Sequence, residues 1–250
     1  MTETRVSDLA LVASPAGCFN AFSSLYDSQY SQSLANLHAY LSSWRTPDGL
    51  GGIITTWWSS SVDTAEPHPM NQAPFMLGAA RLVSAGVKGD WISLLKHEAS
   101  GLEKQVEEDG LLRNGWGDLP GRPLAPVIGF SAAGGMYAAA GATGIDNFLV
   151  AADSILRGYE RTFSDQSRLY HGVANQAARW AITRLQRYYL LGEVRDLEGA
   201  VEIGDAVLKD QVGSGPNAGA IYQGSNSDIL ISVYVGKCLY ALLSIYRASG

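Results

Sequence analysis

Apolar residues recur at helical spacing along most of the chain, and runs rich in Gly, Pro and polar residues separate the segments that carry them. Leu34, Leu37, His38 and Leu41 follow an i, i+3, i+4, i+7 pattern, which is typical of a helix with one buried face. The pattern predicts eight helices. Seven lie at about residues 19–44, 71–85, 125–142, 146–163, 173–191, 196–209 and 228–247, and the third in order follows Asp90 with an apolar stripe of Trp91, Leu94, Leu95 and Leu102.

These predicted helices alternate in character. The odd ones are amphipathic, and the charged run KHEASGLEKQVEED on the third predicts a solvated outer face. The even ones are apolar on most sides and rich in Ala and Gly, which is typical of buried helices. The alternation predicts an all-α fold in one domain, with an inner and an outer layer built from four hairpins at about 19–86, 88–144, 146–192 and 195–250.

The starts of the even helices also resemble one another. Asn-Gln-Ala occurs at 71–73 and again at 175–177, and Gly-Phe-Ser at 129–131 and Asn-Ser-Asp at 226–228 occupy the corresponding places. A loop of polar and aromatic residues precedes each start, and the longest of these loops opens the stretch 109–144. Helix-pair repeats of this length bury their apolar faces by stacking on their neighbours.

With the loop-to-helix segments DGLLRNGWGDLPG and SRLYHGVANQAARWA, this repeat resembles the (α/α) toroid superfamily. That group includes six-hairpin glycosidases, heparinase-type polysaccharide lyases and terpenoid-cyclase toroids. The resemblance implies that the loops entering the inner helices line the mouth of a central cavity. Since four hairpins are evident where six are usual, we expect an open or smaller ring, or one that a second copy or a partner chain completes.

In such a ring the four loops would bring aromatic and polar side chains together at the helix N-termini, where unsatisfied N–H groups favour anionic ligands. We expect the substrate to contact one set of these residues: Trp57, Trp58, His68, Asn71, Trp116, Asn175, Arg179 and Tyr222. Structural roles stay open for several of them. Asn71 and Asn175 could be N-caps, Trp116 a core aromatic, and Arg179 the partner of a buried carboxylate rather than of a ligand anion.

General acid–base chemistry is the sharpest catalytic prediction. Asp118 lies in a Gly/Pro loop, where desolvation could raise the pKa of its carboxyl group. Tyr170 and His171 are adjacent, and such a pair can abstract and donate a proton. We therefore predict Asp118, His171 and Tyr170 as catalytic residues. The sequence offers no clear second carboxylate for a two-carboxylate hydrolase.

Composition narrows the possible partners. The formal net charge of −6 and the lack of clustered Lys and Arg argue against nucleic acid. No nucleotide-binding or metal-ligand motif occurs, so we expect neither a cofactor nor a metal. The chain has no secretory signal at its N-terminus and no apolar run long enough to span a membrane, and we expect a cytoplasmic protein with a small-molecule substrate.

Three functions remain open. The first is a carbohydrate-active hydrolase or lyase that acts on a small oligosaccharide, including one that contains a uronate. The second is an isoprenoid or polyketide cyclase or isomerase, in which the same aromatics would stabilise cationic intermediates. The third is a non-catalytic helical scaffold. The tryptophans and polar loop residues favour the first.

Overall fold

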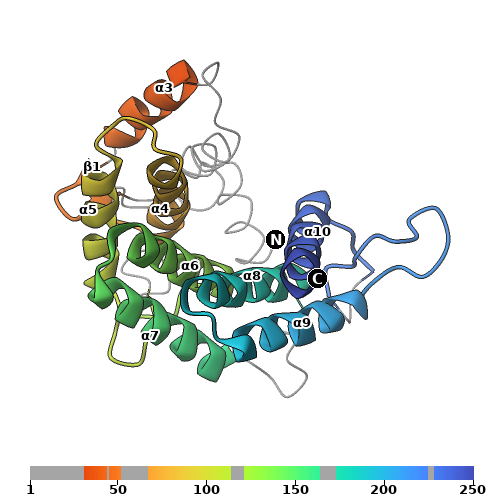
Figure 1. The fold of residues 1–250 in the computed structure, drawn as a ribbon. Helices are drawn as coiled ribbons and strands as arrows, with labels where there is room; N and C mark the ends of the chain where they lie inside the picture. The colour runs from red at the N-terminus through yellow and green to blue at the C-terminus, as the bar shows by residue number, and fades with distance from the viewer. Residues whose placement is uncertain (1–30, 44, 52–66, 114–120, 164–172, 225–227) are drawn as a thin grey trace. The chain divides into compact units, whose positions relative to one another are not determined.

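The computed structural model describes residues 31–43, 45–51, 67–113, 121–163, 173–224 and 228–250, and eight helices dominate these ranges. The elements are α3 (Ser31–Ser42), β1 (Arg45–Thr46), β2 (Gly49–Leu50), α4 (Pro69–Ser84), α5 (Trp91–Glu103), α6 (Pro126–Thr143), α7 (Asp146–Phe163), α8 (Ala174–Leu191), α9 (Val194–Leu208) and α10 (Ser232–Ser249) (Figure 1). The chain divides into two compact units, Met1–Gly158 and Tyr159–Gly250, and the boundary falls within α7.

The predicted helices are confirmed, with ends that differ by a few residues. Helix α7 has the predicted bounds, and α6 and α8 begin one residue later than predicted. The glycines that follow α4, α6 and α8 adopt the left-handed conformation expected of C-terminal caps: Gly86 (φ 66°), Gly144 (φ 68°) and Gly192 (φ 72°). Of the first predicted helix, the part before residue 31 lies outside the described residues.

In the first unit α4 and α6 form the buried layer. Thirteen of the 16 residues of α4 and 14 of the 18 of α6 are buried, so both helices are covered on nearly every side. The two helices pack closely where Gly135 faces Ala73, because a Cβ atom at Gly135 would lie 3.1 Å from the Ala73 Cα. Helix α5 packs on both and buries a single face, as predicted for an outer helix.

A short hairpin follows α3 and precedes the first loop. Its strands β1 and β2 pair antiparallel, with Arg45 opposite Leu50 and Thr46 opposite Gly49. The hairpin rests on α5 at Gly101, where an added Cβ would lie 1.6 Å from the Asp48 carbonyl oxygen. Helix α5 therefore needs a residue without a side chain at this position.

Gly101→Ala is expected to destabilise the first unit by about 2 kcal/mol. Overpacking against a backbone atom costs up to ~3 kcal/mol, and the better helix propensity of Ala offsets about 1 kcal/mol of that cost. Urea denaturation should show the loss. Ser100→Ala, a change at the exposed residue beside it, should stay within about 0.5 kcal/mol of the wild type. Equal stability of the two variants would contradict the observed hairpin contact.

In the second unit α8 packs against both α9 and α10, which also contact each other (Figure 1). The expectation that the last helix is buried all round is wrong for α10 within this unit. A single stripe of α10 is buried (Tyr234, Cys238, Ala241 and Ile245), whereas four of its large apolar side chains are exposed (Leu239, Tyr240, Leu243 and Tyr246). Among the described residues, neither α10 nor any other helix has the length and apolar character needed to cross a membrane.

Candidate functional site

The structure places five of the residues predicted to act in the site. His68 and Asn71 lie at the start of α4 in the first unit, whereas Asn175 and Arg179 lie in α8 and Tyr222 in the loop before α10, all in the second unit. The other six predicted residues lie outside the described part of the chain: Trp57, Trp58, Trp116, Asp118, Tyr170 and His171.

Three of the loops that lead into helices are closed at their base by an antiparallel bridge. The bridges join Gly51 to Pro67 before α4, Arg113 to Pro123 before α6, and Gln211 to Ile221 before α10. Backbone hydrogen bonds beside them reinforce each closure, for example from the Leu124 N–H to the Leu112 carbonyl at 2.7 Å. The sequence predicted these loops but not their closed bases, which fix both ends of each loop close to a helix N-terminus.

His68 is the N-cap of α4. Its Nδ1 accepts a hydrogen bond from the Met70 N–H at 3.1 Å, and its own N–H donates to the Leu50 carbonyl at 2.8 Å. The side chain is almost fully buried, and this burial lowers the pKa of the imidazole to about 3. At neutral pH His68 is therefore an uncharged cap whose Nδ1 is an acceptor.

Asn71 is not the N-cap, because α4 begins two residues before it at Pro69. Its Nδ2 donates to the Gly51 carbonyl at 2.7 Å, and both groups are buried. The side chain thus connects the first residues of α4 to the base of the preceding loop. Asn71 remains next to the predicted ligand-binding loop, but its amide group is engaged in holding that loop.

A buried carboxylate that the sequence did not predict holds the same region. Glu98 on α5 is fully buried and accepts hydrogen bonds from the Arg45 side chain at 2.7 Å and from the Leu50 N–H at 2.8 Å. The charged run containing Glu98 was expected to be solvated, and at this residue that prediction is wrong. The signal was present, because Glu98 lies three residues after Leu95 and four before Leu102, on the apolar stripe.

Asn175 lies in the first turn of α8, one residue after its start, and the N-cap is Val173. The side chain is completely buried, and neither amide atom has a hydrogen-bond partner among the described residues. The Ala174 N–H, beside it, donates to the Gln223 carbonyl at 2.8 Å. Asn175 differs in this from its counterpart Asn71, because both its donor and its acceptor have unmet hydrogen bonds.

Asp210 is a second buried polar group in this unit, and the sequence did not indicate it. It lies just after α9 and is 5% exposed. Desolvation raises the pKa of its carboxyl group. Its carbonyl accepts from the N–H of Tyr222, a half-buried residue, at 2.9 Å. In the described residues, no group of three or more His, Cys, Asp or Glu side chains could hold a metal ion.

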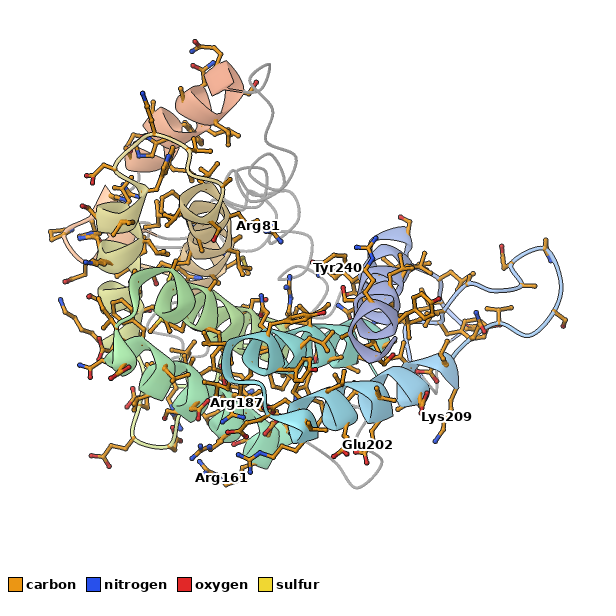
Figure 2. All side chains as sticks on the ribbon, in the orientation of Figure 1. Arg81, Arg161, Arg187, Glu202, Lys209 and Tyr240 are labelled. Atoms are coloured by element: carbon orange, nitrogen blue, oxygen red, sulfur yellow. The ribbon has the colours of Figure 1, made fainter. Side chains whose placement is uncertain are left out.

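Two of the three arginines of α8 form ion pairs with carboxylates of the same unit. Arg184 binds Glu160 at 2.6 Å and Asp196 at 3.6 Å, and Trp180 donates to the same Glu160 oxygen at 2.6 Å. Arg187 extends toward α9, where it pairs with Asp196 and Glu193 (Figure 2). Arg184 and Arg187 are thus structural, and Trp180 is a core aromatic. Arg179, half-buried near the start of the helix, keeps its predicted ligand-binding role as a prediction.

No protein-family model and no curated protein sequence matches the chain. Solved structures do match it. A GH76 α-mannanase from Bacteroides thetaiotaomicron aligns with 98% of this chain and 69% of its own, at 13% identity and a TM-score of 0.69. A D-mannose isomerase aligns with 96% of this chain and 71% of its own, at 13% identity and a TM-score of 0.71.

A cellobiose 2-epimerase from Bacillus thermoamylovorans is similar to the same extent. It aligns with 93% of this chain and 71% of its own, at 11% identity and a TM-score of 0.68. Identities this low carry information on the fold alone, and the fold agrees with the alternation of buried and one-sided helices described above. The chain therefore shares the (α/α) toroid fold of these structures.

Proposed function

We propose that the protein is a carbohydrate-processing enzyme that acts on a small saccharide by general acid–base catalysis. The observation that carries the proposal is Asn175, a fully buried amide with no described partner in the first turn of α8. An unsatisfied buried polar group costs about 1–3 kcal/mol. A ligand rich in hydroxyl groups would satisfy both the donor and the acceptor of this amide.

The fold supports a saccharide over other ligands with hydroxyl groups. The three similar structures described above are a mannanase, a mannose isomerase and a cellobiose epimerase, and each name refers to a sugar. Fold alone does not determine function. The proposal therefore depends on the combination of this fold with a polar group in the first turn of a buried helix.

In this proposal Asp118, His171 and Tyr170 carry the proton transfers, and the tryptophans stack on the sugar. Hydrolysis of a glycosidic bond needs an acid for the leaving oxygen and a second group that activates water or attacks the anomeric carbon. Elimination next to a uronate needs a base that removes the C5 proton and an acid for the leaving oxygen. The described residues add only one unpaired buried carboxyl group to this set, that of Asp210.

Isomerisation or epimerisation of a sugar is the second candidate reaction. It needs a base and an acid that move one proton to and from carbon, and it does not need a second carboxylate acting as a nucleophile. The Tyr170–His171 pair fits this requirement. Two of the three similar structures are an isomerase and an epimerase. The products of one incubation separate the two reactions, because only hydrolysis or elimination shortens an oligosaccharide.

Asn175→Leu is expected to reduce turnover of a saccharide substrate at least about 100-fold, since ~3 kcal/mol of transition-state binding corresponds to that factor. The thermal stability of the variant should equal or exceed that of the wild type, because the change removes an unsatisfied buried amide. Activity is followed on mannobiose, cellobiose, D-mannose and a uronate disaccharide by product chromatography, and stability by thermal unfolding.

Asn71→Leu is the matched control. It should lower stability by about 1–3 kcal/mol, because it leaves the buried Gly51 carbonyl without its donor. Full turnover by Asn175→Leu would remove Asn175 from the site. Stabilisation by prenyl or polyketide-like ligands, with no response to any saccharide, would replace the carbohydrate proposal with the cyclase alternative.

A further inference from the structure

Asp210 is held by its backbone at the end of α9 and is enclosed there. Its N–H donates to the Val207 carbonyl at 3.1 Å, and its carbonyl accepts from the Tyr222 N–H at 2.9 Å. The residue is 95% buried, and its Oδ2 has no hydrogen-bond partner among the described residues. Lys209, the residue before it, is exposed and does not bind the Asp210 Oδ2.

This position is unfavourable for a carboxylate. The C-terminus of a helix carries partial negative charge, which repels an anion. Burial adds a desolvation cost, which is reflected in the raised pKa of the carboxyl group. No interaction within the described structure compensates for these costs. A polar group kept in such a place is a candidate for contact with a ligand.

Asp210 and Asn175 adjoin the same short segment of backbone. Tyr222 donates its N–H to the Asp210 carbonyl, and the next residue, Gln223, accepts from the N–H of Ala174, the residue before Asn175. Gln223 also donates to the Ile229 carbonyl at 2.9 Å, so both of its backbone groups are bonded. Two buried polar side chains with unmet hydrogen bonds thus flank one fixed segment at the start of α8.

We propose that Asp210 is a saccharide-binding residue which, together with Asn175, recognises neutral hydroxyl groups of the substrate. The inference rests on the proposed function and deepens it by naming the class of sugar that this unit binds. An amide offers donors and an acceptor, a carboxyl group offers acceptors, and each sugar hydroxyl can meet either.

A neutral sugar fits these residues better than a uronate. A ligand carboxylate beside Asp210 would meet a group of like charge when Asp210 is ionised. The two structural arginines of α8, Arg184 and Arg187, are engaged by Glu160, Asp196 and Glu193 and do not offset that charge. The uronate of a mixed oligosaccharide would therefore bind elsewhere, and its neutral unit would bind at Asp210.

The test measures saccharide binding by calorimetry to the full chain, with cellobiose and mannobiose as neutral probes and D-glucuronate as the charged probe. Asp210→Ala should weaken binding of a neutral probe at least about 10-fold, a factor that corresponds to one lost hydrogen bond of ~1.4 kcal/mol. Asp205→Ala, a change at an exposed carboxylate on α9, should leave the dissociation constant unchanged. Asp210→Asn keeps the size of the side chain, and it replaces Asp210→Ala in this test if the alanine variant does not fold.

A double-mutant cycle tests whether the two residues form one site. Asp210→Ala and Asn175→Leu together should weaken binding less than the product of their single effects, because contacting the same ligand couples them. Binding by the wild type that neither Asp210 variant changes would overturn this inference and leave the proposed function intact. Tighter binding of D-glucuronate than of the neutral probes would also overturn it. A wild type that binds no saccharide at all would overturn both.

Discussion

Glu98→Ala is expected to lower the free energy of unfolding by about 3–5 kcal/mol, the usual cost of removing one partner of a buried ion pair. Glu98 is fully buried, and its carboxylate binds the Arg45 side chain at 2.7 Å and the Leu50 N–H at 2.8 Å. The alanine variant leaves the guanidinium group beside Phe75 without a counter-charge and the amide without an acceptor. Urea denaturation followed by circular dichroism gives the change.

Two further variants separate the contribution of the Glu98 charge from that of its hydrogen bond to the Leu50 N–H. Glu98→Gln keeps an acceptor for the Leu50 N–H and removes the charge, so its loss should be smaller than that of the alanine variant. Glu103→Ala, a change on the same helix at a half-buried residue, should cost less than about 1 kcal/mol. A loss below ~1 kcal/mol for Glu98→Ala would show that the ion pair does not form in solution.

Glu98→Ala should also affect the loop before α4. Leu50 accepts from the His68 N–H at 2.8 Å, and Gly51, the next residue, accepts from the Asn71 side chain at 2.7 Å. Loss of the Glu98 contact therefore loosens the base of the loop that carries the predicted tryptophans at positions 57 and 58. We therefore expect Glu98 to act on the candidate site through these backbone contacts, as a positioning residue.

The parts of the fold that depend on local patterns could be predicted from the sequence. The 3.6-residue period identified every described helix, and Gly86, Gly144 and Gly192 marked three helix ends. Helix α10 departs from its pattern. Its composition is apolar all round, yet only one stripe is buried within its unit. An apolar helix surface can be buried, but whether it is buried depends on the elements that pack beside it.

The candidate site was less predictable because it depends on contacts between distant residues. The same tripeptide, Asn-Gln-Ala, lies in the first turn of α4 and in that of α8. Asn71 binds the Gly51 carbonyl, however, whereas Asn175 has no described partner. Both asparagines resembled N-caps, whereas the caps are His68 and Val173. Glu98 could have been found from its place on an apolar stripe. Asp210 carries no such signal, because Lys-Asp at the end of an amphipathic helix is typical of an exposed turn.

Acid should destabilise the protein through His68, and His68→Asn should remove that effect. The unfolded chain binds a proton at this imidazole with a pKa of 6.5, whereas burial lowers the pKa in the folded state to about 3. The stability that His68 confers is thus complete above pH 6.5 and is lost as the pH falls toward 3. The loss is about 2 kcal/mol at pH 5 and up to ~5 kcal/mol near pH 3, at 1.36 kcal/mol for each unit.

Asparagine is a suitable replacement because its side-chain oxygen can accept the bond from the Met70 N–H without titrating. At pH 8 the variant should differ from the wild type by no more than about 1 kcal/mol. Urea midpoints measured from pH 8 to pH 5 should fall less steeply in the variant.

His38 contributes to the slope that remains in the variant, because its partial burial, and then Arg45, also lower the pKa of its imidazole. His97→Asn, at an exposed histidine, controls for the loss of an imidazole as such. Equal slopes for wild type and His68→Asn would contradict this expectation, because they would mean that the folded protein binds a proton at His68 as readily as the unfolded chain does.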